Sequence, residues 1–214
     1  MQLTLNELIP EPLRDKLSTT NSGIWKKKVT MQEGECIFIQ APSGTGKTTL
    51  LHVLYGIRHD YAGAVVWGSD NMKRLNEDQL VVLRAQDISI IFQDMRLFPG
   101  LTAWENLQVK VALNGNIAES VIIEWMDRLG IAEKKNALAA TLSYGEQQRV
   151  AILRGLLQPF RWLLMDEPFS HLDRDNTVKA IKLISEVVLQ RKAGILLADL
   201  DENTYFPYTQ TIML

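Results

Sequence analysis

The segment 41–49 constrains the fold more than any other part of the chain. It consists, in order, of Ala41, Pro42, Ser43, Gly44, Thr45, Gly46, Lys47, Thr48 and Thr49. An apolar, strand-like run precedes it and a helical pattern follows it, which is the context of a phosphate-binding loop. The glycines let the backbone curl and turn its N–H groups inward, and the helix presents its positive N-terminal end to the same anion. The segment therefore predicts a phosphate site between a strand and a helix.

Two side chains of this loop have the chemistry to hold a nucleotide. Lys47 can reach the β- and γ-phosphates, and the Thr48 hydroxyl can ligate Mg²⁺. Ala41 stands where such loops usually have their first glycine, which requires only a φ that a Cβ tolerates. The loop thus predicts binding of ATP with Mg²⁺, against the alternative of a strand-to-helix turn that binds nothing.

Short apolar runs bounded by turn residues recur along the chain, and each is typical of a buried strand. They cover residues 36–39, 64–67, 88–92, 162–165 and 194–197. Helical patterns lie between them, most clearly after the phosphate-binding loop and after residue 143. Strands that alternate with helices indicate an α/β fold with a mainly parallel central sheet.

One stretch, 95–140, differs from the rest because it is rich in helix formers and contains no convincing strand. It predicts a helical subdomain inserted into the α/β core. We therefore expect a single domain, 1–214, whose core comprises 1–93 and 158–214. The helical subdomain would cover about 94–157, and a small antiparallel β part would lie near the N-terminus.

Composition and charge indicate which classes of protein the chain can belong to. The chain has 214 residues, of which 46% are hydrophobic, as expected for one globular domain. Its net charge is −2 and its basic residues are scattered, so we expect no nucleic-acid partner. The single cysteine, Cys36, fits a reducing cytosol. No signal-peptide pattern and no apolar stretch near the roughly 20 residues that span a bilayer occur, so a membrane role would require another chain.

The run 162–165 ends in two adjacent carboxylates, Asp166 and Glu167. A carboxylate at the tip of a buried strand is costly unless a cation or a donor compensates it, and Mg²⁺ is the natural compensation. Successive side chains on a strand point in opposite directions, so the two residues cannot share one task. We assign Asp166 to Mg²⁺ and Glu167 to the attacking water as general base. If the phosphate-binding loop were not present upstream, a structural role for the two carboxylates as helix caps would be equally well supported.

A second anion cradle lies shortly before these carboxylates. Residues 142–149 read Leu-Ser-Tyr-Gly-Glu-Gln-Gln-Arg, with Ser143 as a helix cap and Gly145 allowing close approach. This segment closely resembles the signature sequence of ABC ATPases, usually Leu-Ser-Gly-Gly-Gln. Tyr144 replaces the first glycine and Glu146 the final glutamine. The resemblance covers roughly residues 23–214 and implies a P-loop NTPase, RecA-like core of the ABC type.

The resemblance also implies the assembly and further site residues. Family members form a head-to-tail dimer in which each ATP lies between the phosphate loop of one subunit and the signature of the other. Ser143, Gly145 and Glu146 would then contact the ATP of a second copy, which we expect to form a homodimer. Gln93 matches the glutamine that touches Mg²⁺ and the attacking water, and 170–173 matches the loop that crosses the dimer interface.

One branch of the family fits best. The segments 83–84, 88–94 and 97–106 look most like the lipoprotein-releasing, macrolide-export and FtsE-type cell-division ATPases. Members of that branch pair with an integral membrane permease, whose short cytoplasmic helices dock beside the glutamine loop. The resemblance implies an ATP hydrolase, peripheral on the cytoplasmic face of the inner membrane. We expect the partner to dock at Gln93 and 97–101, where Phe98 and its neighbours offer apolar anchors.

Two family features are missing. The family usually has an adenine-stacking aromatic residue about thirty positions before the phosphate-loop lysine, but 9–14 contains none, and Trp25 would serve only if the N-terminal turn were rearranged. A histidine that holds the γ-phosphate follows the strand after the Glu167 region. Aligned on the run 194–197, that position is Ala198, which predicts slow hydrolysis.

Two rival functions stay open. A regulatory ABC module would bind ATP to switch a partner and hydrolyse little of it, as the absent histidine allows. A DNA-repair type of ABC ATPase would share these motifs, but such proteins usually carry coiled-coil or zinc-bearing insertions. The chain shows neither heptads nor cysteine pairs between the loop and the signature.

Overall fold

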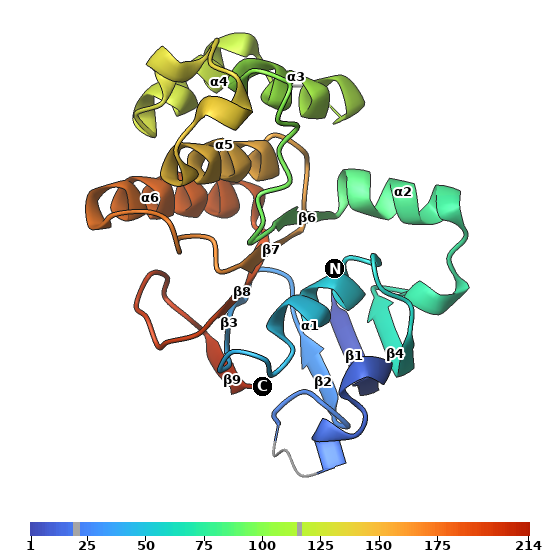
Figure 1. The fold of residues 1–214 in the computed structure, drawn as a ribbon. Helices are drawn as coiled ribbons and strands as arrows, with labels where there is room; N and C mark the ends of the chain where they lie inside the picture. The colour runs from blue at the N-terminus through green and yellow to red at the C-terminus, as the bar shows by residue number, and fades with distance from the viewer. Residues whose placement is uncertain (19–21, 115–116) are drawn as a thin grey trace.

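The computed structural model describes residues 1–18, 22–114 and 117–214 (Figure 1). Its central sheet has five parallel strands in the order β6-β7-β8-β3-β9. These strands are β3 (Cys36–Gln40), β6 (Ile88–Ile91), β7 (Trp162–Asp166), β8 (Gly194–Asp199) and β9 (Gln210–Met213). Strands β6, β7 and β8 are buried on both faces, which explains why their sequences are nearly continuous apolar runs. The predicted α/β fold with a mainly parallel sheet is confirmed.

A second, antiparallel sheet has the strand order β2-β1-β4-β5. It comprises β1 (Leu3–Pro10), β2 (Lys28–Met31), β4 (Tyr61–Trp67) and β5 (Asp70–Asn71). Burial along β4 alternates over part of the strand because only one face of this sheet meets the core. The run 64–67, predicted as a buried strand, therefore belongs to the small antiparallel part.

Helices cover both faces of the parallel sheet (Figure 1). The longer ones are α1 (Lys47–Leu54), α2 (Glu77–Gln86), α3 (Ala103–Asn114), α4 (Glu119–Arg128), α5 (Tyr144–Leu156) and α6 (Arg174–Arg191). Neighbouring side chains of one strand enter different cores: Ile37 and Ile39 join α1 and the antiparallel sheet, whereas Phe38 joins α5 and α6. None of the described helices is long and apolar enough to cross a membrane.

The helical subdomain lies above the core in Figure 1, over α5. Within 95–140, the described residues form α3, α4 and short 3-10 turns, and their only strand-like pairing is an isolated bridge between Thr102 and Leu138. This agrees with the helical texture expected from the sequence. The division at 94–157 stays a prediction, because α5 packs on both β6 and α3.

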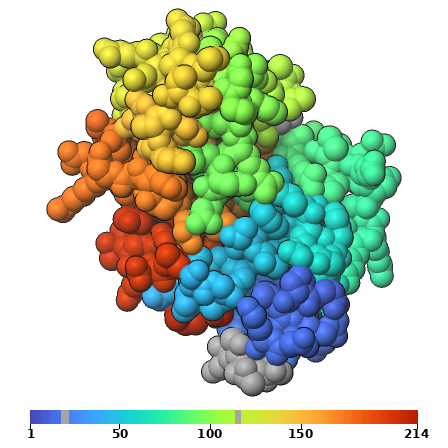
Figure 2. Space-filling view, in the orientation of Figure 1, coloured from blue at the N-terminus to red at the C-terminus, as the bar shows by residue number. Residues whose placement is uncertain are grey.

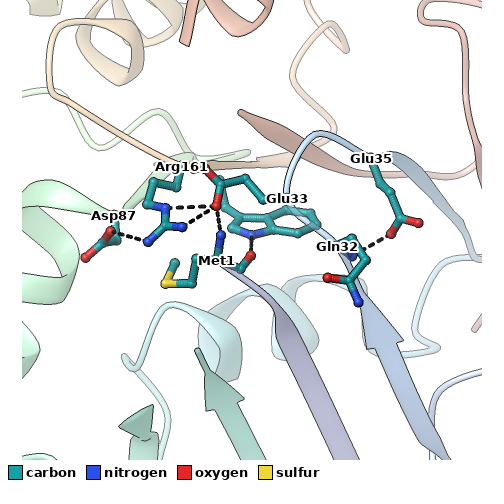
Figure 3. Close-up of polar contacts among 7 residues, drawn as sticks. Met1, Gln32, Glu33, Glu35, Asp87 and Arg161 are labelled. Carbon is teal, nitrogen blue, oxygen red and sulfur yellow. Dashed lines mark hydrogen bonds and ion pairs between the residues drawn. The ribbon is translucent and has the colours of Figure 1, made fainter. Parts of the chain in front are cut away.

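Polar contacts tie the N-terminal strand to the central sheet, as Figure 3 shows. Arg161, just before β7, lies 2.5 Å from Glu33 and 3.9 Å from Asp87. The Trp162 indole N–H donates to the Met1 carbonyl at 2.9 Å, and the Met1 ammonium pairs with Glu33. Exposed ion pairs contribute little to stability. The buried Trp162 ring therefore contributes more than the Arg161 ion pairs to holding β1 on the central sheet.

Gly194 leaves the space that the Trp162 ring fills. A Cβ built on Gly194 would lie 2.8 Å from two ring carbons of Trp162, whose side chain is fully buried. We predict that Gly194→Ala lowers the free energy of unfolding by about 1 to 3 kcal/mol, because overpacking forces the ring or strand to move. Gly100→Ala is the matched control, since a Cβ there meets nothing within 4 Å. Urea denaturation of both variants measures the difference, and equal stabilities would contradict this packing.

Candidate functional site

The phosphate-binding loop lies between β3 and α1, as predicted. Gly44 and Gly46 have φ of 79° and 108°, values that disfavour any residue with a Cβ. Gly46 caps α1 without a side-chain hydrogen bond, so the first N–H groups of the helix stay available to an anion. Ala41 is absent from the residues with positive φ, and its N–H donates to the Asp199 carbonyl at 3.1 Å. An alanine is therefore compatible with this position.

Lys47 is folded back onto its own loop. Its ammonium donates to the Ala41 carbonyl at 2.8 Å and lies 3.4 Å from a carboxylate oxygen of Glu167. Only 6% of the residue is exposed. A phosphate group would supply charged acceptors, which form stronger hydrogen bonds with the same ammonium than a carbonyl does. A phosphate at the loop could therefore replace the Ala41 carbonyl as the partner of Lys47.

The Glu167 carboxylate contacts both Gln93 and Lys47. Its Oε2 accepts a hydrogen bond from the Gln93 amide at 2.8 Å, while Oε1 faces Lys47. Its backbone has a φ of 44°, a left-handed conformation that costs energy and is typical of functional positions. The Glu167 N–H donates to the Ala198 carbonyl at 2.9 Å, which anchors this turn on β8. Lys47, Gln93 and Glu167, distant in sequence, thus converge as expected.

Asp166 offers an unpartnered oxygen for a cation. It is 2% exposed at the end of β7, and its Oδ1 has no hydrogen-bond partner. Burial raises its pKa to about 6, against a hydrogen bond with the Thr48 side chain that lowers it, with the charge of Glu167 also raising it. Thr48, Gln93 and Asp166 line one small cavity with His52 and Asp94. A hydroxyl, an amide and a carboxylate are oxygen donors that suit Mg²⁺.

The signature segment forms the start of α5. The Ser143 hydroxyl accepts from the Glu146 N–H at 3.3 Å, and the Glu146 carboxylate accepts from the Ser143 N–H at 2.8 Å. A Cβ on Gly145 would lie 2.9 Å from the His171 carbonyl, which explains the glycine. Tyr144 is 68% exposed and stacks on His171. The expected segment 170–173 thus lies directly beside the signature.

The two anion cradles do not meet within one chain. The cleft beside the phosphate loop is lined by Leu13, Ser43, Gly44, Gly46, Lys47, Thr48, Thr49, Gln93 and Glu167. Ser143, Gly145 and Glu146 are not part of that lining. Contacts from the signature to the same nucleotide therefore require a second chain. The carboxylate of Glu146 is moreover engaged by the Ser143 N–H and by Lys134, so its predicted contact with ATP stays untested.

The structure resolves the question of Trp25. This residue is 3% exposed, and its ring lies 3.2 Å from the position of a Cβ on Gly46. It therefore packs beneath the phosphate loop and presents no open face to a base. The Leu13 side chain, 2.5 Å from the same position, lines the cleft in its place. No sequence signal marked Leu13, because an apolar residue in a polar turn suits many roles.

The position assigned to the missing histidine must be corrected. Ala198 lies inside β8, is fully buried and belongs to the core on the α1 side of the sheet. A side chain there points into packed residues. The strand ends at Asp199, so the first residue after it is Leu200, which is 39% exposed. Alignment on the apolar run 194–197 placed the strand end too early, because the polar Asp199 continues the ladder with Gln40.

Other contacts that sequence analysis missed connect the signature and the loop after β6 to this site. The buried Gln148 donates to the Glu167 carbonyl at 3.3 Å and accepts from the His171 N–H at 2.8 Å. Arg154 donates to the carbonyls of Met95 and Arg96. Both side chains project from α5. Gln148 lies within the signature segment 142–149, but the segment gave no sign of these contacts, and Arg154 lies beyond it.

Comparisons with known proteins agree with this geometry. Residues 26–170 match the family model of ABC transporters. The chain is 33% identical over 178 residues to the lipoprotein-releasing system ATP-binding protein LolD of Legionella pneumophila (strain Lens), covering 82% of this chain and 78% of that protein. It is 31% identical to the cell division ATP-binding protein FtsE of Streptococcus pneumoniae serotype 2, over 76% of this chain and 71% of that one.

A solved structure shares the fold. The dimeric, post-hydrolysis ATP-binding cassette MJ0796 with ADP and Pi superposes with a TM-score of 0.78 at 24% identity, covering 93% of this chain and 88% of that one. The converging loop, carboxylates and signature, together with the matching family model, establish the family. The chain belongs to the ABC transporter family and is one of its ATPase subunits.

Proposed function

We propose that this ABC ATPase subunit binds Mg-ATP in the cleft at Lys47, hydrolyses it to ADP and phosphate, and thereby powers a membrane permease. One observation carries the proposal: Glu167 lies 3.4 Å from Lys47 and 2.8 Å from Gln93. A carboxylate, an ammonium and an amide around one cleft can bind phosphate, orient water and accept its proton. The relatives named as ATP-binding proteins support the same function.

The nucleotide would be held mainly by the loop. Backbone N–H groups at the start of α1, after Gly46, would face the phosphates together with the positive end of the helix, and Lys47 would exchange the Ala41 carbonyl for phosphate oxygens. Thr48, Asp166 and Gln93 would hold Mg²⁺, which would stabilise charge on the phosphates. Leu13 offers an apolar contact beside the loop, where a base-stacking aromatic residue is absent.

The water-activating step depends on freeing Glu167. When Lys47 moves to the phosphates, the carboxylate loses its ion-pair partner and becomes available to a water molecule. Gln93 can then share a water with Glu167, because its amide already lies at hydrogen-bonding distance. Glu167 accepts the proton of that water as it attacks the γ-phosphate.

A second copy of the chain would complete the site. Ser143 and Gly145 lie at the exposed start of α5, outside the cleft of their own chain, where the helix end suits an anion. A homodimer would bring them to the γ-phosphate of the other subunit. The dimeric cassette that shares this fold supports this arrangement.

The partner would be an integral membrane permease, with this chain peripheral on the cytoplasmic face. Two relatives are named as parts of a lipoprotein-releasing system and of cell division, which supports a membrane assembly. No nucleic-acid partner is proposed, because the net charge is −2. The longest described helix between loop and signature has 12 residues, too short for the coiled coils of repair-type relatives.

A regulatory module with little turnover is the second candidate function. The observation in its favour is Leu200, an apolar residue at the position that follows β8, where the family has a histidine. An aliphatic side chain cannot donate a hydrogen bond to the γ-phosphate. We therefore propose that hydrolysis is slow while ATP binding is retained.

Glu167→Gln tests the proposed chemistry. The amide keeps the polarity and size of the side chain but cannot accept a proton, so turnover should fall by about 10² or more while Mg-ATP still binds. The measurements are phosphate release and ATP-dependent dimerisation by size-exclusion chromatography. Glu202→Gln, at an exposed position, is the control and should keep the parental rate. Parental turnover in Glu167→Gln would remove Glu167 from the mechanism.

Leu200→His tests the slow-hydrolysis proposal. A donor restored near the γ-phosphate should raise turnover, up to the roughly 10²-fold that one preorganised donor contributes. Ala198→His is the matched control. Its ring must enter a fully buried strand position, so the variant should lose stability and gain no rate. Steady-state ATPase assays and thermal unfolding separate the two. Equal rates in Leu200→His and the parent would contradict the proposal.

A further inference from the structure

The carboxylate of Glu146 lies beside the place where the signature segment would meet an anion. Glu146 is the third residue of α5, and its Oε2 accepts a hydrogen bond from the Ser143 N–H at 2.8 Å. Its negative charge stabilises the positive end of α5. The same charge opposes any phosphate group that approaches Ser143 and Gly145. One side chain therefore favours the helix and disfavours an anion at the start of that helix.

Glu146 carries its charge at neutral pH. The hydrogen bond from the Ser143 N–H lowers its pKa most, partial burial acts in the opposite direction, and the Lys134 ammonium lowers the pKa further. Like charges repel each other more strongly where two chains exclude water and salt from the space between them. A phosphate group that binds at the start of α5 therefore needs a cation close to Glu146.

Lys134 provides this cation. It ends a short 3-10 turn, η4 (Ala132–Lys134), and its ammonium lies 3.2 Å from Oε1 of Glu146, the carboxylate oxygen that Ser143 does not engage. Among the ion pairs of residues 1–18, 22–114 and 117–214, only this one involves Glu146. In Figure 2 the segment before α5, in yellow, lies on the surface of the helical subdomain, apart from the cyan residues of α1. A second copy of the chain can therefore approach this segment.

The location of this ion pair distinguishes it from its neighbours. The Lys134 side chain is 49% exposed, and pairs with so exposed a partner add little to folding stability. Lys135, the next residue, makes a comparable pair with Glu119 of α4 at 3.5 Å. Only the Lys134 pair involves a residue of the signature segment. Its effect should therefore be on the binding of an anion at that segment, with little effect on folding.

We infer that Lys134 belongs to the ATP site formed between two chains, where its ammonium neutralises Glu146 so that the signature segment accepts the γ-phosphate of ATP bound to the other chain. The inference rests on the proposed homodimer and adds to its ATP site a residue outside the signature segment. Lys134 acts through Glu146 and is a positioning residue. Its loss should weaken the ATP-dependent dimer and leave the chemical step unchanged.

A double-mutant cycle tests the inference. Dimerisation of the full chain with Mg²⁺ and a non-hydrolysable ATP analogue is measured by analytical ultracentrifugation. Lys134→Gln should raise the analogue concentration needed for half-maximal dimerisation about three- to tenfold, a size typical of coupled neighbouring charges. Glu146→Gln removes the negative charge but keeps an oxygen that can accept from the Ser143 N–H. In the Glu146→Gln background, Lys134→Gln should have no further effect.

Lys135→Gln is the matched control, because it removes the same charge one residue away and should leave dimerisation unchanged. Thermal unfolding checks that Lys134→Gln folds as the parent does. If Lys134→Gln weakens the dimer equally in both backgrounds, or has no effect on a parent that does dimerise, the inference is wrong and the proposed function stands. A parent that binds the analogue but never dimerises with it overturns the proposed second copy, and the inference with it.

Discussion

Backbone hydrogen bonds to strand β8 position both the phosphate loop and the turn at Glu167. The Asp199 carbonyl accepts from the Ala41 N–H at 3.1 Å, and the Ala198 carbonyl accepts from the Glu167 N–H at 2.9 Å. Two consecutive residues of one strand thus hold the start of the phosphate loop and the turn that carries Glu167. Because β3 and β7 flank β8 in parallel, both turns emerge at the same edge of the sheet. The distance between Lys47 and Glu167 follows from this pairing.

The electrostatics of the site follow from that proximity. Lys47, Asp166 and Glu167 are all nearly buried, so each charge needs a partner at close range. Lys47 and Glu167 partner each other, whereas one oxygen of Asp166 has no hydrogen-bond partner. A bound triphosphate would give Lys47 more strongly charged acceptors, and its divalent cation would give Asp166 the missing partner. The arrangement therefore favours a ligand that carries negative and positive charge together.

The sequence predicted those parts of the site whose chemistry is local. Three features can each be seen within a few residues of sequence. They are a glycine-rich turn before a helix, an apolar run that ends in Asp166 and Glu167, and a capped helix at Ser143. What depends on packing between distant segments could not be predicted. Ala198 was assigned to the wrong side of a strand end because Asp199, though polar, completes the ladder beside Gln40. Leu13 resembles any other apolar residue of a turn until the fold brings it against Gly46 and into the lining of the cleft.

We expect Lys47 to exchange Glu167 for phosphate when ATP binds. A crystal structure with Mg²⁺ and a non-hydrolysable ATP analogue tests it most directly. The Lys47 ammonium should lie on the β- and γ-phosphates, away from the Ala41 carbonyl. Thr48 and Asp166 should lie at the metal, and Ser143 of a second copy should face the γ-phosphate. A nucleotide bound elsewhere, or Lys47 still paired with Glu167 in the bound state, would contradict it.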